Sequence, residues 1–145
     1  MGPTEFSSLA DVAWYLQRTG RPVRASASGE LAQCSYERGG ATVAVTLRQL
    51  VYPTGSRWLG LSIPICAAER VRPRAALVAA GALPVGALAL WQDQVLVRQT
   101  LPLGGLAAEP LEQALRALVD AAAELAAVAA RAASDAETPY GYLFR

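Results

Sequence analysis

The last third of the chain constrains the fold most strongly, because it carries the longest regular apolar pattern. Apolar residues recur at steps of three and four from Leu111 to Ala129, the spacing of one face of an α-helix. Pro110 and Glu109 stand near the expected first turn, where a proline costs no hydrogen bond and a carboxylate is favoured by the helix dipole. We predict a helix to about Ala133, roughly 35 Å long at 1.5 Å per residue. Its leucine- and alanine-rich seam packs on the chain's own sheet or is partly shared with another subunit.

A shorter helix is predicted near the start of the chain, from Leu9 to Arg18. Ser8 stands before it and Asp11 follows three residues later, a spacing typical of a helix N-cap. Gly20 and Pro22 end the helical pattern, since glycine is common just after a helix and proline does not continue one.

Between these helices the apolar pattern changes to the two-residue alternation of β-strands. Short turns rich in glycine, proline and serine separate the segments, which favours antiparallel pairing of neighbours. The predicted strands are 30–37, 42–52, 57–65, 87–91 and 95–101. A short helix over 74–80, opened by Pro73 and ended by Gly81, is predicted between the third and fourth strands.

These elements predict an α+β fold, in which a five-stranded antiparallel sheet carries helices on one face in the order α-β-β-β-α-β-β-α. A chain of 145 residues has the usual size of one domain. We therefore expect one domain over residues 7–133, followed by a C-terminal aromatic tail over 134–145.

The residue types that the chain lacks limit its chemistry. It contains no histidine, which excludes the pairs in which histidine activates a serine or a cysteine. Cys34 and Cys66 alone do not make a common zinc site, and a thiol in an apolar strand behaves as a small hydrophobe. The glycines form no phosphate-binding loop. We expect no catalytic, metal or cofactor site; an enzyme that uses carboxylates and arginines is the competing class.

Charge and hydropathy also limit the partners. The formal net charge is +1 and no stripe of basic residues is visible, so nucleic-acid binding is not expected. The start of the chain lacks the charged and apolar regions of a secretory signal, and charged or helix-breaking residues interrupt the longer apolar stretches. We therefore expect no membrane span and a cytoplasmic location, where thiols stay reduced.

The order of elements and two local segments resemble the YbjN family and the class I chaperones of type III secretion, which share one chaperone-like fold. The segments are LPVG at 83–86, before the second hairpin, and LPLGGL at 101–106, after it. The likeness covers about Leu9 to Ala133. One departure is Ala82, which stands where an asparagine is usual. The resemblance implies an α+β sandwich, often dimeric, that holds a protein segment, and it supplies no catalytic residue.

We accordingly expect a protein-binding, chaperone-like or adaptor domain that holds a segment of a partner protein. Two tryptophans lie at strand ends next to turns, where a large ring is often only partly buried, and such rings are favoured interface anchors. Core packing of both is the competing interpretation. The aromatic tail could also dock on a partner as a strand or short motif. The candidate partner-binding residues are Trp58, Trp91, Leu77, Tyr140, Tyr142 and Phe144.

We also expect a homodimer, because the hydrophobic share of 53% is high and the resemblance implies dimers. The short helix around Leu77 and one sheet edge are the expected contact surfaces. The alternative function is a non-catalytic regulatory or scaffold component of a larger assembly. Such a component contacts folded partners, whereas a chaperone holds one client as an extended chain.

Overall fold

The structure is a computed structural model that describes residues 4–72 and 86–130. In chain order its elements are β1 (Glu5–Phe6), α1 (Leu9–Arg18), β2 (Val23–Ala25), β3 (Leu31–Arg38), β4 (Ala41–Val51), β5 (Arg57–Ala67), the 3₁₀ turn η1 (Ala68–Arg70), β6 (Ala87–Trp91), β7 (Gln94–Pro102), β8 (Leu106–Ala107) and α3 (Ala108–Ala130).

Six strands form one antiparallel sheet in the order β2-β3-β4-β5-β7-β6, and β1 pairs with β8 in a separate ribbon. The predicted α+β class and antiparallel sheet are confirmed, but the prediction of five strands was wrong. The sixth strand is β2, which pairs with β3. This strand has only three residues, two of them exposed, so it is too short to show an apolar alternation.

The predicted element order also needs correction. The sheet gains β2 after the first helix, and the two-residue strands β1 and β8 flank α1 and α3. Pairs this short depend on contacts between distant parts of the chain and leave no local pattern. The predicted helix over 74–80 and the tail over 134–145 lie outside the described residues.

Helix α1 begins and ends where the sequence predicts. The Ser8 hydroxyl accepts a hydrogen bond from the Asp11 amide at 3.3 Å. In return, the Asp11 carboxylate accepts one from the Ser7 amide at 3.0 Å. These bonds satisfy amide groups that have no partner inside the helix.

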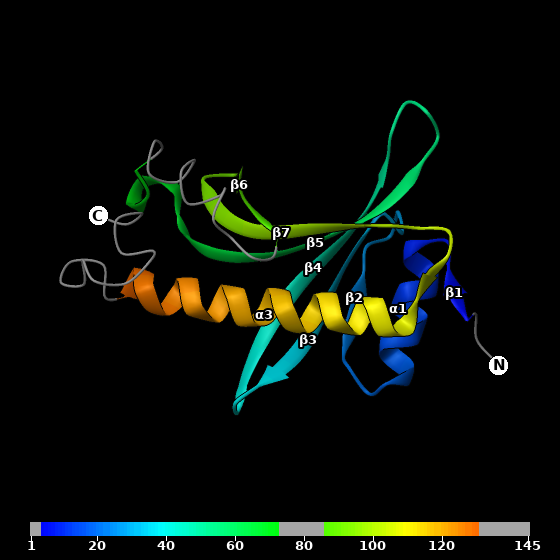
Figure 1. The fold of residues 1–145 in the computed structure, drawn as a ribbon, viewed down its shortest axis with the longest axis horizontal. Helices are drawn as coiled ribbons and strands as arrows, with labels where there is room; N and C mark the ends of the chain where they lie inside the picture. Colours follow the sequence, from blue (N-terminus) through cyan, green and yellow to red (C-terminus); the bar gives the residue numbers. More distant parts are fainter. Residues whose placement is uncertain (1–3, 73–85, 131–145) are drawn as a thin grey trace.

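Helices α1 and α3 cover the same face of the main sheet (Figure 1), α1 against β2 to β4 and α3 chiefly against β5 and β7. The leucine seam of α3 is buried in this contact, which confirms that the predicted helix packs on the chain's own sheet. Within the described residues the buried core contains no polar or charged residue. Its largest fully buried side chains are Phe6, Leu16, Leu47, Leu59, Leu61, Leu111, Leu115, Leu118 and Leu125.

The two halves of β5 have different neighbours, which bends the sheet. Its first half pairs with β4 as far as Ser62, whereas its whole length pairs with β7. Pro64, which has no amide hydrogen to donate, follows the last pair with β4. The register with β7 then shifts between Pro64 and Cys66, and irregularities of this kind increase the local twist. Figure 1 shows β5 and β7 curving away from α3 at the end that carries β6.

Gly86 leads into β6 with a positive φ of 71°, and a Cβ there would lie 2.4 Å from the carbonyl oxygen of Arg98. Gly55 also has a positive φ but no atom within 4 Å of such a Cβ. We expect Gly55→Ala to cost about 1–2 kcal/mol through backbone strain, and Gly86→Ala to cost clearly more because the β7 carbonyl must move. Urea denaturation of both variants measures this difference. Equal losses would contradict the close approach of Gly86 to β7.

Candidate functional site on the outer face of the sheet

The candidate site lies on the sheet face opposite α1 and α3, which we call the outer face. Leu59 and Leu61 of β5 are fully buried in the core. Because successive side chains on a strand point to opposite faces, Trp58, Gly60 and Ser62 belong to the outer face.

The outer face is hollowed over a volume of about 390 Å³, and we call this feature the outer-face hollow. Its size falls within the roughly 300–1,000 Å³ typical of ligand clefts. Gly60 and Ser62 supply small groups on β5, and longer side chains come from the neighbouring strands. The described residues that touch the hollow are Leu31, Thr46, Arg48, Leu50, Gly60, Leu61, Ser62, Pro64, Ala89, Leu90, Trp91, Leu96 and Arg98. Leu61 and Leu90 are among them although strand alternation and register assign their side chains to the core face.

Several apolar side chains of the hollow are exposed. Leu31 is 37% exposed and Trp91 50%, and Pro64 is exposed as well. A single exposed apolar side chain is ordinary, but a contiguous group is typical of an interaction surface. The outer-face hollow therefore has the character of a binding surface.

The apolar surface extends beyond the hollow along the outer face. Leu50 lines the hollow and pairs in register with Trp58. The Trp58 ring contacts the Tyr52 ring edge-on, with 6.1 Å between the ring centroids. Trp58 and Pro64 are six residues apart on β5, about 20 Å at 3.3 Å per residue. The outer face thus offers an elongated apolar surface, which we call the outer-face strip, from Trp91 to Tyr52.

The polar side chains that line the hollow are two arginines and two hydroxyl residues, Arg48, Arg98, Thr46 and Ser62. The Arg48 guanidinium carbon lies 4.6 Å from the centroid of the Trp91 ring. No acidic residue stands among the described lining residues. The described ion pairs instead use arginines on the helix side, Arg21 with Glu112 and Arg38 with Asp120. The polar groups of the hollow therefore provide cationic and hydroxyl donors.

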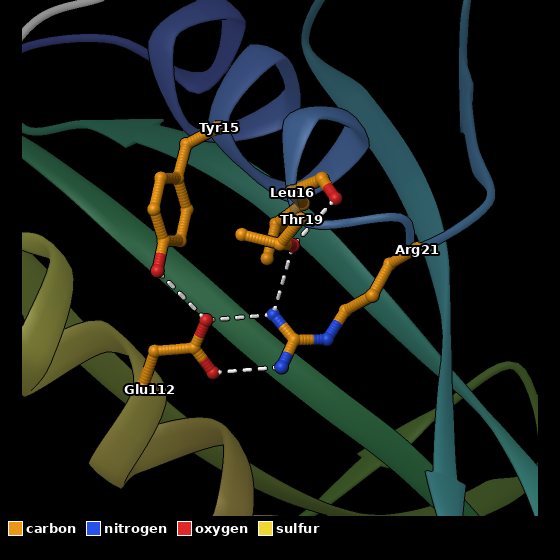
Figure 2. A network of polar contacts seen from close by, with 5 residues as sticks. All are labelled: Tyr15, Leu16, Thr19, Arg21 and Glu112. Atoms are coloured by element: carbon orange, nitrogen blue, oxygen red, sulfur yellow. Dashed lines mark hydrogen bonds and ion pairs between the residues drawn. The ribbon is translucent and has the colours of Figure 1, made fainter.

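A second polar cluster lies between α1, α3 and the start of β2 (Figure 2). The Glu112 carboxylate accepts two hydrogen bonds from the Arg21 guanidinium, at 2.7 and 2.8 Å, and one from the Tyr15 hydroxyl at 2.9 Å. The same guanidinium donates to the Thr19 hydroxyl at 3.3 Å, and that hydroxyl donates to the Leu16 carbonyl at 2.7 Å. The Tyr15 hydroxyl of α1 and the Arg21 guanidinium just beyond that helix both bind the Glu112 carboxylate of α3. The cluster therefore links α1 to α3.

The pKa shifts in this cluster favour a structural role. Burial raises the pKa of Glu112, but the Arg21 and Tyr15 hydrogen bonds and the positive charges of Arg21 and Arg116 outweigh burial and lower it. Burial and the bond to Glu112 raise the pKa of Tyr15, so its hydroxyl stays protonated. Burial also raises the pKa of the neighbouring Cys34 thiol to about 11, which keeps it an unreactive thiol. None of these shifts prepares a group for proton transfer near neutral pH.

We expect Glu112→Gln to lower the free energy of unfolding by about 1–3 kcal/mol, because it leaves the half-buried Arg21 without its counter-charge. The pKa of Glu112 is lower in the folded chain than its usual 4.5. The contribution of the Glu112 carboxylate to the free energy of unfolding is therefore complete above pH 4.5, and it is lost as the pH falls through the folded-state pKa of Glu112. Denaturant unfolding of parent and variant at pH 7 and below pH 4.5 measures this.

The matched control for this prediction is Asp120→Asn, which breaks the Arg38 pair on the same helix. Both side chains of that pair are about half exposed, so a loss of about 0–1 kcal/mol is expected. A Glu112→Gln loss no larger than the control, or one that does not shrink in acid, would contradict the role of Glu112.

The structure brings only part of the predicted site together. Trp91 lines the outer-face hollow, and Trp58 lies partly buried on the same face without lining it. Neither tryptophan belongs to the buried core, so the competing interpretation of core packing for both was wrong. The predicted partner-binding residues Leu77, Tyr140, Tyr142 and Phe144 lie outside the described residues.

Sequence reasoning missed Arg48 and Arg98. Each interrupts an apolar strand at a position that alternates away from the core, between Leu47 and Gln49 and between Val97 and Gln99. That alternation was a usable signal for the outer face. It did not show that the two strands, separated by β5, place their arginines around one hollow.

None of the protein-family models searched matches the chain, and the search of curated proteins finds no significant match. The resemblance to the YbjN family and the secretion chaperones therefore stays a hypothesis. In the described part of the chain, no helix has the length and apolar content needed to cross a bilayer. The same residues bring together no group of three or more side chains of metal-ligating type.

Proposed function

We propose that this domain binds an extended segment of a partner protein along the outer face, with Trp91 as the principal anchor. The observation that carries the proposal is the outer-face hollow, which a half-exposed tryptophan lines together with other apolar side chains. Partly exposed aromatic rings in such surroundings are the side chains on which protein interfaces most depend.

The length of the outer-face strip favours a chain segment over a compact ligand. From Trp91 to Tyr52 the apolar side chains follow the strands of the sheet. The Trp58 to Pro64 stretch alone, about 20 Å, matches some six residues of extended peptide. A small molecule that filled only the hollow would make no contact with Trp58 or Tyr52.

The sheet also supports binding through its rigidity. Around the hollow, β4, β7 and the first half of β5 each have a paired strand on both sides. The other face of these strands is buried against the helices. A surface that is already ordered loses little conformational entropy on binding. This is the property that a chaperone-like or adaptor domain needs in order to hold an otherwise extended client.

We expect Trp91→Ala to weaken binding of a partner segment at least about tenfold, since the main aromatic anchor is lost. The probes are twelve-residue peptides selected from a random display library on the full chain, titrated by fluorescence anisotropy. The melting temperature should fall by less than about 5 °C, because a half-exposed ring on an edge strand contributes only about 1 kcal/mol to stability.

Trp14→Ala is the matched control, because Trp14 is also exposed, at 41%, but belongs to α1 on the opposite side of the sheet. It should leave peptide binding unchanged. Peptides that bind Trp91→Ala as tightly as the parent chain would refute the proposal, as would a collapse of the fold in Trp91→Ala that shows the ring to be a core residue.

The β4–β5 hairpin supports a second candidate function, that of a scaffold or regulatory component that contacts folded partners. Figure 1 shows this hairpin projecting from the rest of the sheet, and Val51 and Tyr52 at its end are 60% and 50% exposed. In this case Val51→Ser with Tyr52→Ser would abolish partner binding, whereas Trp91→Ala would not. The two functions are therefore separable by the same set of variants.

The homodimer also remains a proposal. One expected contact surface, around Leu77, lies outside the described residues. The other, a sheet edge, corresponds to β2 or β6. Light scattering at micromolar concentration distinguishes a dimer from a monomer.

A further inference from the structure

We propose that the segment bound in the outer-face hollow carries an acidic side chain next to apolar ones, and that Arg98 and Arg48 receive its carboxylate. This inference rests on the proposed function and adds the chemistry by which the segment is recognised. It is carried by the charge and the positions of the polar groups in the hollow.

The polar side chains that line the hollow all carry hydrogen-bond donors. The Arg48 and Arg98 guanidinium groups cannot accept hydrogen bonds, and the hydroxyls of Thr46 and Ser62 are able to donate them. No carboxylate among the described lining residues balances the two positive charges. A ligand carboxylate supplies the missing negative charge, and charge-assisted bonds from arginine to carboxylate are among the stronger hydrogen bonds in proteins.

The register places the two arginines on either side of β5. Arg48 of β4 pairs with Gly60, and Arg98 of β7 pairs with Ser62 two residues further along. In a flat sheet the two Cα atoms would be about 12 Å apart, from two strand spacings and one two-residue step. The Leu50 side chain lies over Gly60, with its Cδ1 3.5 Å from where a Cβ there would stand. Ser62, which is small and only partly buried, leaves room above β5 for a carboxylate between the two long side chains.

The contact between Arg48 and Trp91 leaves the guanidinium able to bind an anion. With the guanidinium carbon 4.6 Å from the ring centroid, the attraction is between the cation and the ring. The in-plane N–H groups remain the part of the guanidinium suited to bidentate carboxylate binding. No hydrogen bond or ion pair joins the side chain of Arg48 or Arg98 to another described residue. Both arginines are partly buried, so a counter-charge offsets their loss of hydration.

The apolar lining defines the rest of the segment. Leucines at positions 31, 50 and 96 surround the polar groups together with Pro64 and Trp91. A purely polar anion would leave these side chains exposed, and a purely apolar segment would bury two guanidinium groups without a partner. The favoured ligand is therefore a peptide in which an aspartate or glutamate is flanked by leucine, valine or aromatic residues.

The test uses the full chain and a random library of twelve-residue peptides. Selection on the parent chain should enrich aspartate or glutamate beside apolar residues. A selected peptide and its amide counterpart, with Asn for Asp or Gln for Glu, are then titrated against each chain. The acidic form should bind the parent at least about tenfold more tightly, and its affinity should fall more steeply with added salt because charges are screened.

Arg98→Gln should reduce the preference for the acidic form to about threefold or less, and Arg98→Lys should retain part of it. Arg57→Gln is the control, because Arg57 is exposed and does not line the hollow; it should keep the full preference. Circular dichroism of each variant establishes that the fold is retained. A preference that survives Arg98→Gln together with Arg48→Gln would overturn the inference.

The outcomes separate this inference from the proposed function. Selected peptides that lack acidic enrichment but lose affinity in Trp91→Ala would refute the acidic preference and leave the peptide-binding function standing. If no selected peptide depends on Trp91, both proposals are wrong. Displacement of the peptides by dodecanoate at equal concentration, with loss of dodecanoate binding in Arg98→Gln, would show that the hollow takes a small amphiphilic carboxylate instead of a peptide.

Discussion

The burial of the leucine seam of α3 against β5 and β7 is the contact on which the rest of the structure depends. Leu111, Leu115 and Leu118 are fully buried in it, and each such side chain contributes roughly 1.5–3 kcal/mol through loss of contact with water. Because strand side chains alternate, assigning one face of β5 to this core assigns the intervening residues to the outer face. The packing of the helix thus determines which side chains are left to form a binding surface.

Polar contacts then orient the second helix on that core. The Leu9 amide at the start of α1 donates to the Gln49 side chain on β4 at 2.9 Å, and the Tyr15 hydroxyl donates to Glu112 on α3. Arg21, just beyond the helix, binds the same carboxylate through two nitrogens. Apolar packing alone is not directional, whereas these bonds define how α1 lies across the sheet and against α3.

The outer face differs from the core in its electrostatics as well as in its exposure. On the helix side, Arg21 and Arg38 have acidic partners. On the outer face, Arg48 and Arg98 line a hollow whose described side chains include no acid, and Arg48 packs on a half-exposed tryptophan. A surface that is rigid, apolar and positively charged is suited to bind a segment of complementary chemistry, which connects the peptide-binding proposal with the acidic preference.

The sequence by itself determined the local elements of this protein. The helical spacing of apolar residues and the Ser8 cap predicted α1, and the two-residue alternation with its turns predicted β3 to β7. These patterns are local, because they follow from the periodicity of one helix or one strand. The tertiary structure alone decided the addition of β2, the strand order that places β5 between β4 and β7, and the register shift after Pro64. It therefore also decided that Arg48, Trp91 and Arg98 meet around one hollow, because contacts between strands depend on pairing across distant parts of the chain, which no local period records.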